Sequence, residues 1–287
     1  MQYADANMQY GNPNVQNGNL NAQYANANAI PSNAAPFPLL RGEGPAVGAS
    51  KYQASGTYLW LTLAYGMLGL LVLCSLGFIL FALALGWFID MLFGRRILAR
   101  LRGSCLQVGP AQLPEIDRCV REFSQRLGLK EVPMVLVAES SELNAFALNA
   151  GRRRCVLLMD DAIWASLEAG LPDALRFVVA HELGHHALGH TGALRSYLRA
   201  ILPGLSRLDE LSADAVALQL VGTREAAYEG MMMLTVGPQL LKYTNRNQLL
   251  QQAAEVAADS ASRKAERPLR HPLLLRRLHA LRNAQLG

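Results

Sequence analysis

Four of the six histidines in this chain lie within one apolar segment, FVVAHELGHHALGH, residues 177–190. His181 and His185 are four positions apart, so on a helix their imidazoles lie one turn apart on the same face. That spacing lets both rings bind a single zinc ion. Glu182 is rotated by about 100° from His181 around such a helix, which places it beside the metal as the base for a zinc-activated water. The pattern predicts a nucleophile able to attack a peptide carbonyl.

The third metal ligand must come from outside this pattern. A third histidine on the same stretch would require glycine at Leu188 and histidine at Thr191, and His190 is one position short. The alternative is a glutamate from a later helix. Glu210 lies in the segment DELSAD, with Asp214 one turn further along the same face. We therefore predict that Glu210 binds the zinc ion and that Asp214 supports a ligand histidine by a hydrogen bond.

The predicted ligand helix is apolar around its histidines. Ala174, Phe177 and Val178 continue the histidine face, so the ligands point into a core, where unliganded histidines would be costly to bury. His186 and His190 are interpreted as structural or solvent-facing.

The elements that would position these residues are mostly helical. Helices are predicted at residues 110–129, from Pro172 and Asp173 through the histidines, at 205–221, 224–243 and 249–265, and at the carboxyl end. Strands are predicted at 132–138 and, joined by a turn at 151–154, at 144–148 and from residue 155. The predicted fold class is α+β: a mostly helical, zincin-like metallopeptidase domain, residues 95–287, with a small antiparallel sheet.

A membrane anchor is predicted at residues 57–94, because residues 58–93 form an apolar stretch whose one charge is Asp90. One long tilted span and two short spans with a turn near residues 75–77 both fit this length. Arg95, Arg96, Arg100 and Arg102 follow directly, and positive charge beside a span marks the cytoplasmic side. The stretch is too long for a cleavable signal.

The rest of the composition bounds the environment. Residues 1–56 are rich in Asn, Gln and Ala, which predicts a disordered tail. The net charge of +5 suits anionic lipid headgroups at the bilayer, and no nucleic acid is needed to explain it. The four cysteines show no CxxC spacing, which disfavours disulfides and favours a reducing compartment.

HELGH followed by ELSAD resembles the HtpX-type gluzincin metallopeptidases, a group that also contains the zinc CaaX prenyl proteases and the OMA-type mitochondrial proteases. The resemblance covers roughly residues 113–281 and includes LPEI, NAFAL, MDDAIW and RHP. It implies one zinc ion on His181, His185 and Glu210, with Glu182 as general base. It further implies an edge strand that binds the substrate backbone through Asn144, Ala145 and Phe146, and His271 as a stabiliser of the oxyanion.

The sequence departs from the HtpX pattern in one respect. HtpX proteins carry further spans between the zinc helix and the third ligand, whereas here 24 residues that include Arg195 and Arg199 separate His185 from Glu210. This disfavours cleavage within the membrane.

The favoured function is a membrane-anchored zinc endopeptidase at the cytoplasmic face of the inner (plasma) membrane. By analogy with the family it acts on peptides or unfolded proteins in quality control. The competing hypothesis is a non-catalytic scaffold or chaperone-like protein, against which the intact Glu182 argues. Processing of prenylated proteins is disfavoured by the lack of a multi-span chamber.

Overall fold

The computed structural model describes residues 45–75, 77–140, 144–150, 153–168, 170–241 and 243–286. The greater part of the predicted disordered tail, residues 1–44, lies outside these ranges. The helices are η1 (Ala49–Tyr52), α2 (Thr57–Cys74), α3 (Phe78–Ser104), α4 (Pro114–Arg126), α5 (Asp160–Glu168), α6 (Pro172–Ala187), α7 (Ala193–Ile201), α8 (Pro203–Val221), α9 (Arg224–Leu241), α10 (Arg246–Ala258), α11 (Ser260–Glu266) and α12 (Leu274–Asn283). The strands are β1 (Leu106–Gln107), β2 (Met134–Ala138), β3 (Ala145–Ala150) and β4 (Arg153–Met159). The predominance of helix over strand confirms the predicted fold class.

The strands form one sheet in the order β1-β2-β4-β3. β3 and β4 form the predicted antiparallel hairpin, with Ala145 opposite Leu158. β2 and β4, however, are parallel, so the sheet is mixed and the expectation of a purely antiparallel sheet was wrong. The reason lies in the strand order: the hairpin places β4, whose residues Cys155, Val156 and Leu158 are fully buried, in the interior of the sheet. β3 is left at the edge.

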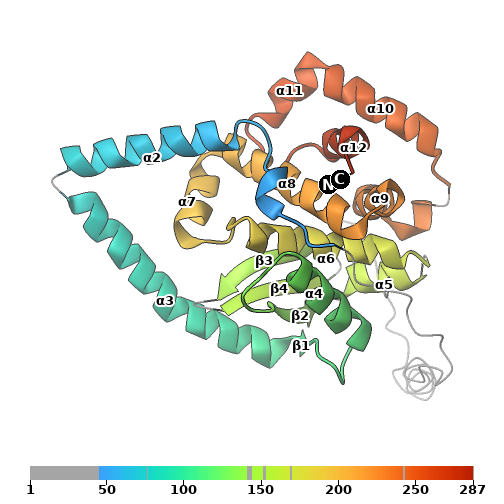
Figure 1. Ribbon diagram of the computed structural model, residues 1–287, viewed down its shortest axis with the longest axis horizontal. Helices are drawn as coiled ribbons and strands as arrows, with labels where there is room; N and C mark the ends of the chain where they lie inside the picture. The colour runs from blue at the N-terminus through green and yellow to red at the C-terminus, as the bar shows by residue number, and fades with distance from the viewer. Residues whose placement is uncertain are drawn as a thin grey trace, which may run out of the picture. The chain divides into compact units, whose positions relative to one another are not determined.

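Helix α6 is the centre of the helical core. It begins with Pro172 and Asp173 in its first turn, a favourable start for a helix, and it packs most extensively against α8 and α9. In Figure 1 it runs between the sheet and these two helices. A Cβ atom at Gly184 would lie only 3.3 Å from the carbonyl oxygen of Ala213 on α8. This close approach brings the predicted ligands of α6 and α8 together.

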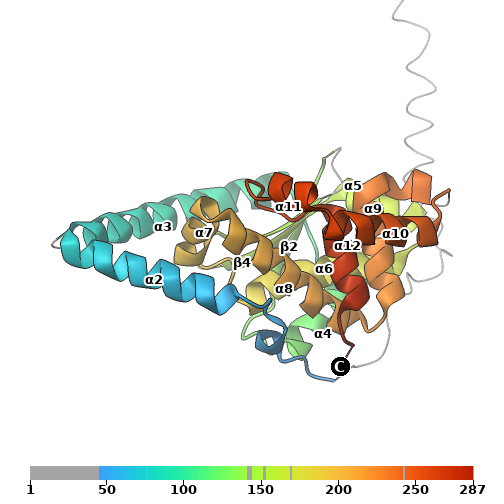
Figure 2. The same cartoon turned by 90° about the horizontal axis from the view of Figure 1, so that it is seen from above.

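The predicted anchor consists of two helices. α2 ends at Cys74 and α3 begins at Phe78, directly after Gly77, which takes a left-handed backbone conformation (φ 88°) that favours glycine. Both helices are long and apolar enough to cross a membrane by length and composition, and little of each is buried, which is unlike a core helix. Figures 1 and 2 show the end of α2 close to the beginning of α3, with the two helices diverging from there and α7 between them. α3 continues as far as Ser104 and therefore carries the arginine cluster.

The first apolar helix, α2, and the residues just before it contact the helical core at two points. Ala64 of α2 packs with Leu198 of α7 and Leu205 of α8 in one buried apolar cluster. Just before α2, the backbone N–H of Ala54 donates a hydrogen bond of 2.8 Å to Ser212 Oγ of α8. The helix that carries Glu210 is therefore in direct contact with the first apolar helix.

Candidate metal site

The two predicted histidine ligands lie one turn apart on α6. The Nε2 atoms of His181 and His185 are 3.2 Å apart, and the ring planes are nearly perpendicular, at 86°. Both residues are buried. The HExxH spacing thus places two imidazole nitrogens at one point, as the sequence predicts.

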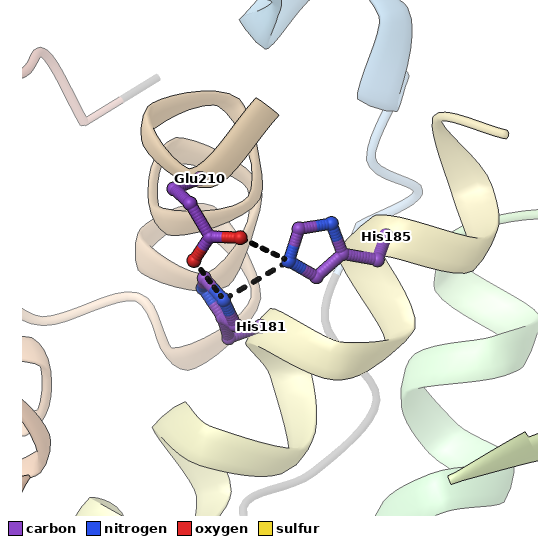
Figure 3. Close-up of side chains that lie close together, drawn as sticks. All are labelled: His181, His185 and Glu210. Atoms are coloured by element: carbon purple, nitrogen blue, oxygen red, sulfur yellow. Dashed lines mark hydrogen bonds and ion pairs between the residues drawn. The ribbon is translucent and has the colours of Figure 1, made fainter. Parts of the chain in front are cut away.

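Glu210 completes the cluster from α8. Its Oε2 lies 3.5 Å from His181 Nε2 and its Oε1 lies 3.4 Å from His185 Nε2, as Figure 3 shows. A tetrahedral zinc ion with ligand atoms at about 2.0–2.1 Å keeps those atoms roughly 3.3 Å from one another. Two nitrogens and one carboxylate at these separations therefore fit a single zinc ion with room for a fourth ligand.

Asp214 contacts the His181 ring at the nitrogen that faces away from the cluster. His181 Nδ1 lies 2.9 Å from Asp214 Oδ1, the predicted contact. Asp214 is in turn clamped by the guanidinium of Arg277 on α12, with N–O distances of 2.7 and 2.8 Å. Burial raises the pKa of the Asp214 carboxyl, but the charge of Arg277 outweighs it and holds that pKa below its ordinary value. Asp214 is therefore an anion that orients the ring.

The charges around the cluster favour a cation at its centre. Burial opposes a charge on His181, yet hydrogen bonds to Asp214 and Glu210 raise the pKa of His181 to about 9. Burial also acts against the charged form of Glu210, but the imidazoles of His185 and His181 hold the pKa of Glu210 well below its ordinary value. With a pKa of about 9, His181 carries a proton at neutral pH when no metal is bound. A metal ion would displace that proton.

His190 supports the second ligand. It is completely buried, and its Nδ1 lies 2.9 Å from Nδ1 of His185. Its Nε2 lies 3.4 Å from Asp209 Oδ1, and Asp209 accepts a hydrogen bond of 3.1 Å from Arg195 Nε. When His185 Nε2 faces a metal, its Nδ1–H donates a hydrogen bond to His190 Nδ1. The proton of His190 is then on Nε2, which lies near Asp209 but makes no hydrogen bond among the described residues. His190 is thus structural, as predicted, and it is not solvent-facing.

His186 has a different structural role. It is buried, its Nε2 donates a hydrogen bond of 3.0 Å to the Cys155 carbonyl, and its Nδ1 lies 3.1 Å from Thr191 Oγ1. Burial lowers the pKa of His186 to about 4, so the ring is neutral at physiological pH. The residue ties α6 to the central strand β4.

A cleft of about 480 Å³ opens over the cluster. The predicted substrate-binding residues Asn144, Ala145 and Phe146 line it at the start of β3, which is paired with β4 alone among the described strands. Glu182 also lines the cleft and is largely buried, yet it is not one of the three clustered ligands. Glu182 is therefore available as a candidate base, because it lines the cleft without belonging to the three clustered ligands.

His271 lies at the mouth of this cleft. Its side chain is 69% exposed, and its Nδ1 lies 3.2 Å from Glu210 Oε2. The RHP motif is the one feature of the sequence that indicated His271 as a site residue. In this arrangement it contacts the carboxylate of a predicted ligand.

Two arginines of the site were not predicted as functional. Arg199 of α7 donates to Glu210 Oε1 at 3.0 Å, and Arg277 clamps Asp214. Arg195 and Arg199 are four positions apart, a spacing that could have suggested a helix face directed at acidic residues. The spacing does not indicate their partners, which are Asp209 and Glu210 on α8.

Comparison with known proteins relates this geometry to one family. Residues 110–197 match the family model described as peptidase family M48. Among curated proteins, the chain is 34% identical over 119 residues to a "Protease HtpX homolog" of Syntrophobacter fumaroxidans, covering 42% of this chain and 38% of the relative. It is 32% identical over 138 residues to a "Protease HtpX homolog" of Bacillus pumilus (47% and 44%) and 30% identical over 128 residues to "Protease HtpX" of Idiomarina loihiensis (44% and 42%).

The matches are partial. The chain spans less than half the length of each of these relatives. No solved structure matches it. The family model includes α6 and ends before Glu210, so the third ligand is supported by the geometry rather than by that match. The matched segment includes the helix that carries both clustered histidines, and together with the three similar proteins it supports an HtpX-type member of peptidase family M48.

Proposed function

We propose that this protein is a zinc endopeptidase anchored in the membrane by α2 and α3. The observation that carries the proposal is the cluster of His181, His185 and Glu210, whose neighbouring nitrogen and oxygen atoms lie 3.2–3.5 Å apart. The buried carboxylate of Glu182 lines the same cleft and is not part of this cluster. An ion bound there would act as a Lewis acid and would lower the pKa of its water towards 7. Glu182 is the residue that would accept the proton from the attacking water and pass it to the leaving amine.

The substrate is proposed to bind along β3. An extended peptide can pair with the open edge of this strand through backbone hydrogen bonds, and Asn144, Ala145 and Phe146 lie where that strand passes the metal ligands. His271 and Arg199 are the cationic or hydrogen-bonding groups near Glu210. In the proposal, His271 donates to the developing oxyanion.

The length of the groove favours an endopeptidase. A second cleft of about 480 Å³ follows β3 past the metal site, lined by Leu148 and Asn149 and by Trp87 of α3. Ala147 and Arg199 line both clefts. The groove therefore offers room for several residues beyond the cleaved bond, which an exopeptidase does not require.

Removal and restoration of the metal test the proposal. The full chain in detergent micelles is expected to contain one zinc ion and to cleave an unfolded protein such as casein. Dialysis against a chelator should abolish cleavage, and one equivalent of zinc should restore it, because the attacking water is activated by the ion. Elemental analysis and a fluorescent casein assay measure both quantities. A zinc-loaded chain that binds casein and never cuts it would support the scaffold hypothesis instead.

The pair of apolar helices, α2 and α3, is proposed to place the tail and the catalytic domain on the same, cytoplasmic side of the inner membrane. The arginines of α3 mark that side by the positive-inside rule. Resistance of the chain to extraction by alkaline carbonate would establish the anchorage. A role in quality control, on misfolded or membrane-associated proteins, is carried over from the family alone.

The native cysteines offer a test of this topology. Cys74 is exposed in the last turn of α2, beside the hairpin turn, whereas Cys105 follows α3 on the domain side. Cys119 and Cys155 are buried, and burial raises the pKa of Cys119 to about 12, so neither should react. A membrane-impermeant maleimide applied to right-side-out vesicles is expected to label Cys74, and Cys105 only after permeabilisation. Labelling of Cys105 in sealed vesicles would place the domain outside.

A further inference from the structure

A larger hollow, of about 750 Å³, is lined by residues from the beginning of α2 and from α8, α11 and α12. It is separate from the metal ligands. Its lining is strongly basic and includes one acidic side chain, that of Glu266. The basic residues are Arg207, Arg263, Lys264, Arg267 and Arg276.

Most of this positive charge has no anionic partner within the described residues. Glu266 is ion-paired with Arg276 and accepts the backbone N–H of Leu273 at 3.1 Å. Arg207 donates from Nη1 to three backbone carbonyls at 2.7–3.0 Å, which are neutral acceptors and leave its charge uncancelled. Arg263, Lys264 and Arg267 form no ion pair in the described part of the chain.

A buried donor at the same hollow is also unsatisfied. Asn283 Nδ2 lies 3.0 Å from Nε2 of His279, and since an amide nitrogen donates, that ring nitrogen accepts. The ring proton of neutral His279 is therefore on Nδ1, which is buried and has no hydrogen-bond partner in the described part of the molecule. In addition, burial and the charges of Arg263 and Arg207 lower the pKa of Arg276. Repelling cations and an unused N–H donor both point to an anionic ligand rich in acceptor oxygens.

The position of the hollow identifies the source of that anion. Ser55, Gly56 and Trp60, at the beginning of α2, form part of its wall, and Trp60 packs so closely on α8 that a Cβ at Gly204 would lie 3.0 Å from its ring. If α2 spans the bilayer, its first turn lies at the membrane surface, where tryptophan is enriched. The cytoplasmic leaflet presents anionic headgroups at that level, and basic pockets beside membrane helices bind them.

We propose that this hollow binds the phosphate headgroup of an anionic phospholipid. The inference rests on the membrane anchorage proposed above and does not depend on catalysis. Pro272 lines both this hollow and the metal cleft, and its neighbour His271 contacts Glu210. A headgroup held by Arg207 and Arg267 would therefore brace the segment that carries His271 beside the metal site.

Native mass spectrometry of the full chain in neutral detergent, titrated with phosphatidylglycerol or phosphatidylcholine, tests the proposal. The wild type is expected to retain phosphatidylglycerol at about tenfold lower concentration than phosphatidylcholine. The variant Arg263→Gln/Lys264→Gln/Arg267→Gln should lose this preference. The matched control Lys130→Gln/Arg153→Gln/Arg282→Gln removes the same charge from exposed positions that do not line the hollow and should keep it. Circular dichroism melts establish that both variants are folded.

Three outcomes would overturn the headgroup site. Equal loss in the two triple variants would mean that net charge, not this hollow, attracts the lipid. No preference in the wild type would exclude an anionic lipid as the occupant. Displacement of phosphatidylglycerol by inorganic phosphate at an equal concentration would mean that free phosphate is the ligand. Failure of the anchorage itself would be recognised separately, as extraction of the chain by alkaline carbonate.

Discussion

Replacing Glu182 by glutamine is expected to leave the fold and the bound metal in place and to lower kcat for peptide cleavage by about 10²–10⁴-fold. Glutamine has nearly the same shape, and Glu182 is not among the three clustered ligand residues, so the substitution keeps the packing and the ligand set. What is lost is the ability to take a proton from the attacking water. The measurement is kcat for a fluorogenic peptide together with zinc content, on full chain in micelles.

Glu210→Gln provides the matched comparison, because it makes the same chemical change one helix away. The amide is a far poorer ligand than the carboxylate, so this variant should lose its zinc ion as well as its activity. Zinc retained with activity lost identifies the base, and zinc lost identifies a ligand. Cleavage by Glu182→Gln at the wild-type rate would assign proton transfer to another residue.

Replacing Arg277 by methionine is expected to lower the free energy of unfolding by about 3–5 kcal/mol. Arg277 is buried and binds both oxygens of Asp214, so the substitution leaves a carboxylate in the core without its partner. Because Asp214 also orients His181, zinc affinity should fall by about 10–100-fold. Denaturant unfolding in micelles and competition with a zinc chelator measure the two effects.

The exposed Arg282, on the same helix α12, supplies the control. Arg282→Met should change the free energy of unfolding by no more than about 0.5 kcal/mol. Adding Asp214→Ala to Arg277→Met removes the unpaired carboxylate and should recover part of the lost stability. If the double variant is no more stable than Arg277→Met, the loss does not come from the stranded charge of Asp214.

The parts of the site that follow from spacing along one helix could be predicted from sequence. His181 and His185 had to share a face once α6 formed, and Glu210 and Asp214 likewise on α8. The two helices meet as closely as they do because Gly184 has no side chain. The HELGH pattern contains this glycine, but it does not indicate how closely α6 and α8 approach each other.

The parts that depend on contacts between distant segments could not be predicted. Helix α7 was not expected, and its arginines were treated only as charges that exclude a membrane span. The structure directs Arg195 to Asp209 and Arg199 to Glu210, and both acidic residues are on another helix. The parallel pairing of β2 with β4 similarly depends on strand order, which the local alternation of residues does not encode.

The choice between Arg276 and Arg277 illustrates the same limit. Both follow the HP motif, and nothing in the sequence indicates which of them contacts the site. The face of α12 decides, because Arg277 shares it with the buried residues Leu278 and Leu281, whereas Arg276 pairs with Glu266 outside the site. A side chain one position away is rotated by about 100° and meets a different neighbour.

The position of Arg277 on α12 also sets the order in which the parts of the site are synthesised. A growing polypeptide that has reached Val221 already contains His181, His185 and Glu210, but not the guanidinium that keeps Asp214 ionised against His181. The ribosome must add more than fifty further residues before that clamp exists. A nascent chain therefore contains all three clustered side chains before it contains the one that fixes the orientation of the first.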